Sequence, residues 1–339
     1  MTGHRDQQKG MDMRALASAR IGAFVVLLAA AGLVSAGSAA AAPISFDLCA
    51  VAGTTTPVSG ADPVPIWGFG APATPGDCGT ATAALPGPQL VVTTGDTVTV
   101  TVHNALPGTR TVSLDIPGIT VVPDPVDPPP GPVTRTFTFT ATTPGTYLYA
   151  SGGDAGRQQA MGLYGMLIVR PATANQAYDT PASGYDVEAP MVLSVLDPVF
   201  NANPDDPVTA NLVNYRATWW LINGKSYPDT TPIQASATQR VLLRYANAGF
   251  DNTSMALLGG HQRVIARDAN LLSTVLDAAA ETIPAGATED TIFTMPSSAA
   301  PAPNGFAIYN RQLHVTNGSQ GGTSPTPATG GGMMTFIGP

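Results

Sequence analysis

Residues 97–103 alternate strictly between hydrophilic side chains and valine. A period of two indicates a β-strand with one buried face. The pattern predicts that Val98, Val100 and Val102 point into a core, while the threonines and His103 face outward. Short segments of similar composition recur along the chain, separated by turn-forming dipeptides. We expect further strands at residues 134–140, 145–149, 162–169, 191–196, 241–245 and 333–337.

The composition favours the same class of fold. The 339 residues include 36 Gly and 32 Pro, which promote turns and disfavour long helices. Helical periodicity is scarce, and residues 270–280 are the best segment for a short helix, which we expect there. Many short strands with frequent turns predict an all-β fold of the sandwich type.

Two parts of the chain repeat the same order of motifs at an offset of about 140–160 residues, the length of one domain. The matching segments are 97–114 with 239–257, 144–149 with 304–309, and 161–169 with 332–337. The repeat predicts two related β-sandwich domains, at residues 43–170 and 188–339. A linker at residues 171–187 would join them.

The first 42 residues have the order of regions typical of a secretory signal peptide. Arg14 and Arg20 precede an apolar run at 21–34, and small residues follow at 38–42. We expect cleavage near Ala41 or Ala42, which would release a secreted, periplasmic or cell-envelope protein. The alternative is an uncleaved anchor, but the apolar run is short for a bilayer.

Two cysteines, Cys49 and Cys78, are present in the chain. In an oxidising compartment outside the cytoplasm a disulfide is the expected state of such a pair. The alternative, a metal thiolate, would need further ligands nearby, and the segment between the cysteines has no histidine. We therefore predict a disulfide between Cys49 and Cys78.

The charge of the chain argues against two classes of partner. The net charge is −8, and removal of the first 42 residues, which hold four basic and two acidic side chains, makes it −10. A protein with a negative net charge of this size lacks the excess of basic side chains that attracts nucleic acid or anionic lipid. The sequence also lacks a nucleophile elbow, a His-Glu-x-x-His pair and a phosphate-binding loop.

Several segments resemble the multicopper oxidase family. They are Phe46-Asp47-Leu48, Ile66-Trp67-Gly68-Phe69, 85–90 and 95–98 at the opening of a domain, 145–149 and 161–165 at its close, and 221–225, 242–249 and 264–268 in a later domain. The resemblance covers most of the chain after residue 42. It implies two cupredoxin-like Greek-key β-sandwich domains.

In that family the resemblance implies copper bound by histidine pairs, a cysteine and often a methionine. Imidazole and thiolate ligands suit copper because they bind both of its oxidation states. After residue 42 this chain has three histidines, His103, His261 and His314. Eight histidine ligands of a trinuclear cluster cannot come from three.

The family's ligand positions carry other residues in this sequence. Asp115 and Pro117 stand at one His-x-His pair, and Ala150 and Gly152 stand at the next. The later pairs are replaced by Ala256-Leu257-Leu258-Gly259-Gly260 and by Asn310-Arg311-Gln312-Leu313-His314. We therefore predict no catalytic residue and no cofactor, although copper remains the alternative.

Four residues are weak candidates for a metal site. His261 lies one residue past a ligand position, and we expect it to be a loop histidine. His314, Met333 and Met334 form the most copper-like remaining set, because the family's methionine ligand has a similar Gly-Met-Met context. We expect His103 to be an outward-facing residue at a strand end.

Three functional hypotheses follow. The first is a non-catalytic binding or scaffold protein with a protein or glycan partner outside the cytoplasm. The second is a copper-binding protein or multicopper-oxidase-type oxidoreductase with an unconventional copper site or one completed across a homo-oligomer interface. The third is a carbohydrate- or matrix-binding module that uses exposed tryptophans among Trp67, Trp219 and Trp220.

Overall fold

The computed structural model describes residues 43–123, 133–208, 211–297, 305–317 and 330–339. The predicted signal peptide, residues 1–42, lies outside the described residues. Within them the regular secondary structure is mostly β-strand, as predicted. The helical segments are η1 (Cys78–Thr80), η2 (Asp154–Gly156), α1 (Arg157–Met161), η3 (Pro181–Ser183), α2 (Pro198–Ala202) and η4 (Leu212–Asn214). None of the described helices is long and apolar enough to cross a membrane.

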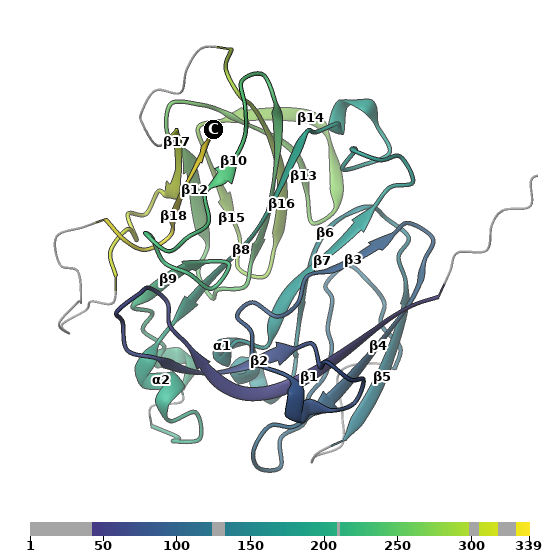
Figure 1. The fold of residues 1–339 in the computed structure, drawn as a ribbon, viewed down its shortest axis with the longest axis vertical. Helices are drawn as coiled ribbons and strands as arrows, with labels where there is room; N and C mark the ends of the chain where they lie inside the picture. The colour runs from purple at the N-terminus through teal and green to yellow at the C-terminus, as the bar shows by residue number, and fades with distance from the viewer. Residues whose placement is uncertain (1–42, 124–132, 209–210, 298–304, 318–329) are drawn as a thin grey trace, which may run out of the picture. The chain divides into compact units, whose positions relative to one another are not determined.

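The first sandwich packs a four-stranded sheet against a three-stranded sheet (Figure 1). The larger sheet contains, in spatial order, β2 (Val64–Gly70), β1 (Ile44–Thr55), β4 (Thr97–Asn104) and β5 (Thr134–Thr140). The smaller contains β3 (Leu90–Thr93), β7 (Tyr164–Arg170) and β6 (Gly145–Ala150). Val98, Val100 and Val102 are buried between the sheets, which confirms the face predicted from the alternation in this strand.

The second sandwich packs a six-stranded sheet against a five-stranded sheet. The six-stranded sheet contains β14 (Asn270–Ala278), β13 (Gln262–Arg267), β16 (Thr288–Thr294), β11 (Arg240–Asn247), β8 (Val187–Leu196) and β9 (Trp219–Ile222). The five-stranded sheet contains β10 (Ile233–Gln234), β18 (Met334–Gly338), β17 (Phe306–Asn310), β12 (Thr253–Leu257) and β15 (Ala280–Ile283).

The two sandwiches share a pairing pattern, as the internal repeat predicts. In the first, β4 pairs in parallel with β1, and in the second, β11 pairs in parallel with β8. The antiparallel pair β6–β7 likewise corresponds to β17–β18. The matching sequence segments therefore occupy equivalent strands.

The expected helix at residues 270–280 is wrong. These residues form β14 and run into β15 after Ala278. Asp268 and Ala269 have φ values of 46° and 58°, which turn the chain directly back from β13 into a hairpin. Pairing with β13 decided the conformation of a segment whose local pattern was ambiguous.

Apolar clusters join the two sandwiches within the compact unit formed by residues 41–339. In one cluster, Ala150 and Met166 of the first sandwich pack with Val192 and Ala246 of the second. In another cluster, Val58, Val64 and Ile66 pack with Leu196, Trp219 and Leu221. The segment predicted as a linker also packs onto the second sandwich, because Tyr178 is buried against Leu242 and Ile265.

Cys49 and Cys78 form the predicted disulfide, with their Cα atoms 5.5 Å apart. Cys49 is fully buried in β1, whereas Cys78 begins the short helical turn η1. The bond therefore ties the loop after β2 to the first strand of the sandwich.

Candidate functional site

The first pair of family ligand positions lies in a hydrogen-bonded segment of the first sandwich. The backbones of Asp115 and Ala150 exchange two hydrogen bonds, of 2.8 and 2.9 Å. This pairing places residues 113–115 beside residues 150–152, where the second pair of positions lies. The two pairs of positions are therefore brought together, as they would be in a metal centre.

Hydroxyl and amide groups of neighbouring residues form a hydrogen-bonded network beside these positions. Ser151 donates to Gln158 Oε1 at 2.5 Å and accepts from the Ser113 N–H at 3.1 Å. Ser113 Oγ in turn accepts from the Gly152 N–H at 3.0 Å, and Gln158 Nε2 donates to Thr111 O at 2.6 Å. The side chains of Ser113, Ser151 and Gln158 are buried and use their polar atoms on one another.

The corresponding positions in the second sandwich are apolar. Ala256 and Leu257 are buried in β12, and Leu258 is exposed at the end of the strand. His261 follows in an exposed turn, as expected of a loop histidine, and borders a shallow hollow with Arg263 and Asp277.

The other candidate ligands have separate packing partners. The His314 ring stacks on Trp220, with centroids 4.3 Å apart and an angle of 11° between the planes. Burial lowers the pKa of His314, and Asp251 partly opposes this effect. Met333 is buried in the core, where its sulfur lies 3.8 Å from Asn310 Nδ2, and Met334 begins β18. Backbone hydrogen bonding brings Met333 beside His314, but the structure does not bring His261 into this group.

His103 lies at the end of β4, where Nδ1 is 2.9 Å from Thr134 Oγ1 and Nε2 is 3.0 Å from Asp47 Oδ1. Thr134 is therefore a hydrogen-bond partner of Nδ1, whereas Nε2 lies within ion-pair distance of Asp47 without an aligned hydrogen bond. Its half-buried position on the threonine face agrees with the outward orientation that we expected from the strand pattern.

The donor set at the family's copper positions does not fit a conventional copper centre. Asp115, Pro117, Ala150 and Gly152 stand at the paired positions in place of histidine, and both cysteines are consumed by the disulfide. Within the described part of the chain, no three His, Cys, Asp or Glu side chains gather as a metal-binding group would require. The absence of a cofactor itself stays a prediction.

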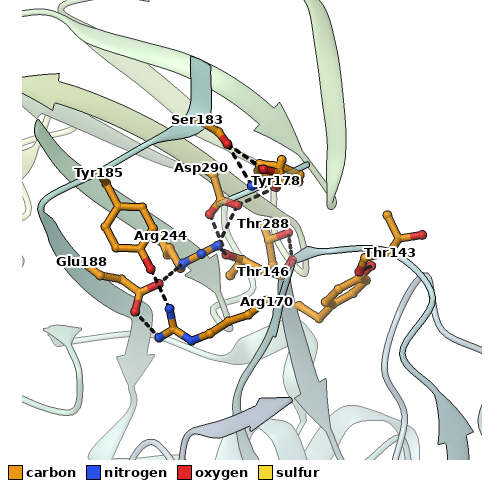
Figure 2. Close-up of polar contacts among 11 residues, drawn as sticks. Thr143, Thr146, Arg170, Tyr178, Ser183, Tyr185, Glu188, Arg244, Thr288 and Asp290 are labelled. Carbon is orange, nitrogen blue, oxygen red and sulfur yellow. Dashed lines mark hydrogen bonds and ion pairs between the residues drawn. The ribbon is translucent and has the colours of Figure 1, made fainter. Parts of the chain in front are cut away.

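A buried charged network lies where the two sandwiches meet (Figure 2). Arg244 of β11 is fully buried, and its Nε donates to Glu188 Oε1 at 2.8 Å. Its Nη1 lies 3.2 Å from Asp290 Oδ2 and donates to Thr146 Oγ1 at 3.0 Å. Because Thr146 belongs to β6 of the first sandwich, Arg244 links the two sandwiches.

The remaining donors complete the network around both carboxylates. Asp290 accepts hydrogen bonds of 2.6 Å from the Thr146 and Tyr178 hydroxyls. The Nη2 atom of Arg170 lies 2.5 Å from Oε2 of Glu188 and forms an ion pair with it. Burial raises the pKa of Glu188, but Arg244 and Arg170 outweigh it and hold the pKa below its ordinary value. These residues are up to 144 positions apart, so sequence analysis found no signal for the network.

Glu289, beside Asp290 in β16, faces a different environment. Its Oε2 accepts from Arg267 Nε at 3.0 Å, while its Oε1 is buried with no hydrogen-bond partner among the described residues. Burial raises the pKa of Glu289 to about 8, and the attraction of Arg267 does not offset this effect.

We expect the raised pKa of Glu289 to make stability depend on pH. Between about pH 4.5 and 8 the folded state binds a proton that the unfolded chain releases, so the free energy of unfolding falls as pH rises through this window. Glu289→Gln should flatten the slope by up to about 1.4 kcal/mol per pH unit, the value for one proton. Urea unfolding at pH 5, 6.5 and 8.5 measures this, and an unchanged slope in the variant would assign the effect to other groups.

Two sandwiches with this strand pairing define a cupredoxin-like protein, as predicted. A blue copper oxidase from Nitrosomonas europaea has a similar structure, with a TM-score of 0.70 and 21% identity, over 88% of this chain and 86% of that one. The multicopper oxidase mgLAC has a TM-score of 0.67 and 21% identity, over 87% and 86% of the two chains. A copper nitrite reductase from Nitrosomonas europaea has a TM-score of 0.65 and 23% identity, over 80% and 90%.

Residues 74–174 match the sequence model of the multicopper oxidase family. No curated protein sequence matches the chain. The chain is therefore multicopper-oxidase-like: the family match lies in the first sandwich and the start of the following segment, and the likeness of fold extends over most of the chain. The resemblance stated from the sequence motifs is confirmed at this level.

Proposed function

We propose that this chain is a non-catalytic binding or scaffold protein of the cell envelope or extracellular space, built on a multicopper oxidase fold. The observation that carries the proposal is the set of residues at the family's paired ligand positions, Asp115, Pro117, Ala150 and Gly152, none of which offers an imidazole. Beside them Ser113, Ser151 and Gln158 use their polar atoms on one another and on neighbouring backbone groups, and Ala150 packs in the apolar contact with the second sandwich. A metal would have to displace these contacts without gaining an imidazole.

Export outside the cytoplasm is part of this proposal. The order of basic, apolar and small residues before residue 43 supports a signal peptide. The disulfide between Cys49 and Cys78 supports an oxidising environment.

The tryptophans support a glycan-binding role less well than the sequence suggested. Trp67 and Trp219 are buried: Trp67 packs in the core of the first sandwich, and Trp219 packs in the apolar cluster between the sandwiches. Trp220 is partly exposed, but His314 covers one face of its ring. The partner of the proposed binding protein is therefore more naturally sought with a protein pull-down than with a glycan screen.

Copper content tests the proposal directly. The protein, exported with its own N-terminus, is loaded with copper, desalted against a weak chelator and analysed by mass spectrometry. We expect retention well below one copper per chain, because no described donor set offers the usual imidazole and thiolate ligands. One or more tightly held coppers per chain would overturn the proposal.

The same experiment tests the alternative, a copper site completed between subunits. Size-exclusion chromatography before the metal analysis separates monomer from oligomer. Copper confined to an oligomer and lost in His314→Ala, but kept in His103→Ala, would establish the alternative. His103 is the matched control because it lies in β4 of the first sandwich, where its Nδ1 is hydrogen-bonded to Thr134.

A further inference from the structure

A hollow of about 360 Å³ opens on the side of the second sandwich. It lies beside the short edge strands β9 and β10. Because these strands are short, part of the neighbouring strand in each sheet has no pairing partner on that side. The last residue of β9, Ile222, pairs with Leu193, so β9 does not reach the first half of β8. Residues 187–191 of β8 therefore line one wall, and β10 lines the opposite wall.

The interior of this hollow is mainly apolar. Val187, Ala189 and Met191 alternate along β8, and their side chains belong to or pack against the core of the second sandwich. Ile222 and Ile233 contribute the facing apolar surface. The volume and the lining are those of a site for a small organic molecule.

Asn223 already satisfies part of the strand edge beside the hollow. Asn223 Oδ1 accepts from the Val192 N–H at 2.8 Å, and Asn223 Nδ2 donates to Pro190 O at 2.9 Å. Proline at position 190 has no N–H to offer. Addition of a further peptide strand would have to displace Asn223, so the hollow suits a small molecule better than a strand.

A single uncompensated charge lies at the rim. Lys225 Nζ donates to Thr56 O at 2.8 Å, and Lys225 makes no ion pair with any residue that the structure describes. An ammonium group has three donors, so two remain for a ligand. The other charged residue of the lining, Glu188, is neutralised by Arg170 and Arg244. The rim therefore favours a negatively charged group.

We propose that this hollow binds a small amphipathic anion. Its apolar body lies against Val187, Ala189 and Ile233, and its carboxylate or sulfonate group accepts hydrogen bonds from Lys225. The site is separate from the family's copper positions, so the proposal does not depend on whether the chain holds copper.

Two fluorescent probes with related apolar bodies test this. 8-Anilinonaphthalene-1-sulfonate carries the anionic group, and N-phenyl-1-naphthylamine lacks it. We expect Lys225→Met to weaken binding of the sulfonate about tenfold, the value of one charge-assisted hydrogen bond, and to leave the neutral probe unchanged. Equal loss of both probes, or of neither, would overturn the assigned role of Lys225.

A second variant tests the hollow itself. Gln234→Trp places a large ring over the mouth from an exposed position and should abolish binding of both probes. Val213→Trp, at a highly exposed site outside the hollow, is the matched control and should bind normally. Unchanged binding in Gln234→Trp would overturn the location of the site.

A measurement on the unaltered protein keeps the test independent of variant folding. Lys225 is the only lysine after Lys9 in the sequence. An amine-reactive reagent followed by peptide-mapped mass spectrometry therefore reports on Lys225 alone. The sulfonate probe should slow modification of Lys225 at least severalfold, and an unchanged rate would contradict the proposal.

Discussion

Arg244→Met is expected to lower the free energy of unfolding by about 3–5 kcal/mol, the cost of leaving a buried charge without its partner. Arg244 is fully buried between the carboxylates of Glu188 and Asp290. Methionine fills much of the same space but returns no charge. Arg170 still pairs with Glu188 in the variant, so the unpaired charge falls mainly on Asp290. Urea unfolding followed by tryptophan fluorescence measures the loss.

Arg263→Met is the matched control, because Arg263 is half exposed and lies 3.9 Å from Asp277 on the surface of the same sandwich. Exposed pairs of this kind contribute about 0–1 kcal/mol. The double variant Arg244→Met with Asp290→Asn should lose less than the sum of the single variants, because each disrupts the same contact. A loss below about 1 kcal/mol in Arg244→Met would show that the network does not stabilise the contact between sandwiches.

Replacing both Cys49 and Cys78 with serine should lower the free energy of unfolding by about 3–4 kcal/mol on the chain-entropy model. The disulfide closes a loop between residues 29 positions apart. It restricts the unfolded chain and attaches the η1 turn to β1. Thermal unfolding of the oxidised wild type and of the double variant gives the difference.

Reduction supplies the control for the disulfide. A reducing agent should destabilise the wild type to nearly the level of the double variant and leave the variant itself unchanged. If the oxidised wild type and the double variant unfold together, the disulfide contributes no net stability. A variant that is destabilised further by the reductant would point to damage unrelated to this bond.

The two sets of predictions separate stability from function. Arg244 and the disulfide maintain the fold, whereas the copper and probe experiments ask what the fold binds. The likeness to a blue copper oxidase and a copper nitrite reductase is below 25% identity and therefore concerns the fold alone. The ligand positions of this chain carry no imidazole, and the residues beside them, Ser113, Ser151 and Gln158, form a hydrogen-bonded cluster.

Local sequence pattern was sufficient for the strands that combine alternation with clear turns. The segment 97–103 and the segment 134–140 lie in β4 and β5, which pair with each other along their full length. Alternation predicts these strands correctly because each strand buries one face, so that every second side chain lies in the core. The cysteine pair was also predictable, since two cysteines allow one intramolecular disulfide.

Pattern failed for residues 270–278, where the apolar spacing suggested a helix. Leu271, Val275 and Leu276 are partly exposed on β14. Their spacing therefore does not correspond to the buried face of a helix. The hairpin turn at Asp268 and Ala269 and the hydrogen bonds to β13 determine the strand instead. Both depend on pairing between segments rather than on local propensity.

The sequence by itself determined the class of fold, the repeat, the disulfide and the loss of the family's histidines. Each of these follows from the identity of particular residues or from the local spacing of apolar and polar side chains. Only the tertiary structure decided how the residues beside the lost ligands bond to one another, how Arg244 joins Thr146 to Asp290, and where Lys225 meets an apolar hollow. These features bring together residues up to 169 positions apart. Burial and pairing at such separations arise from packing between strands, and no local pattern in the chain encodes them.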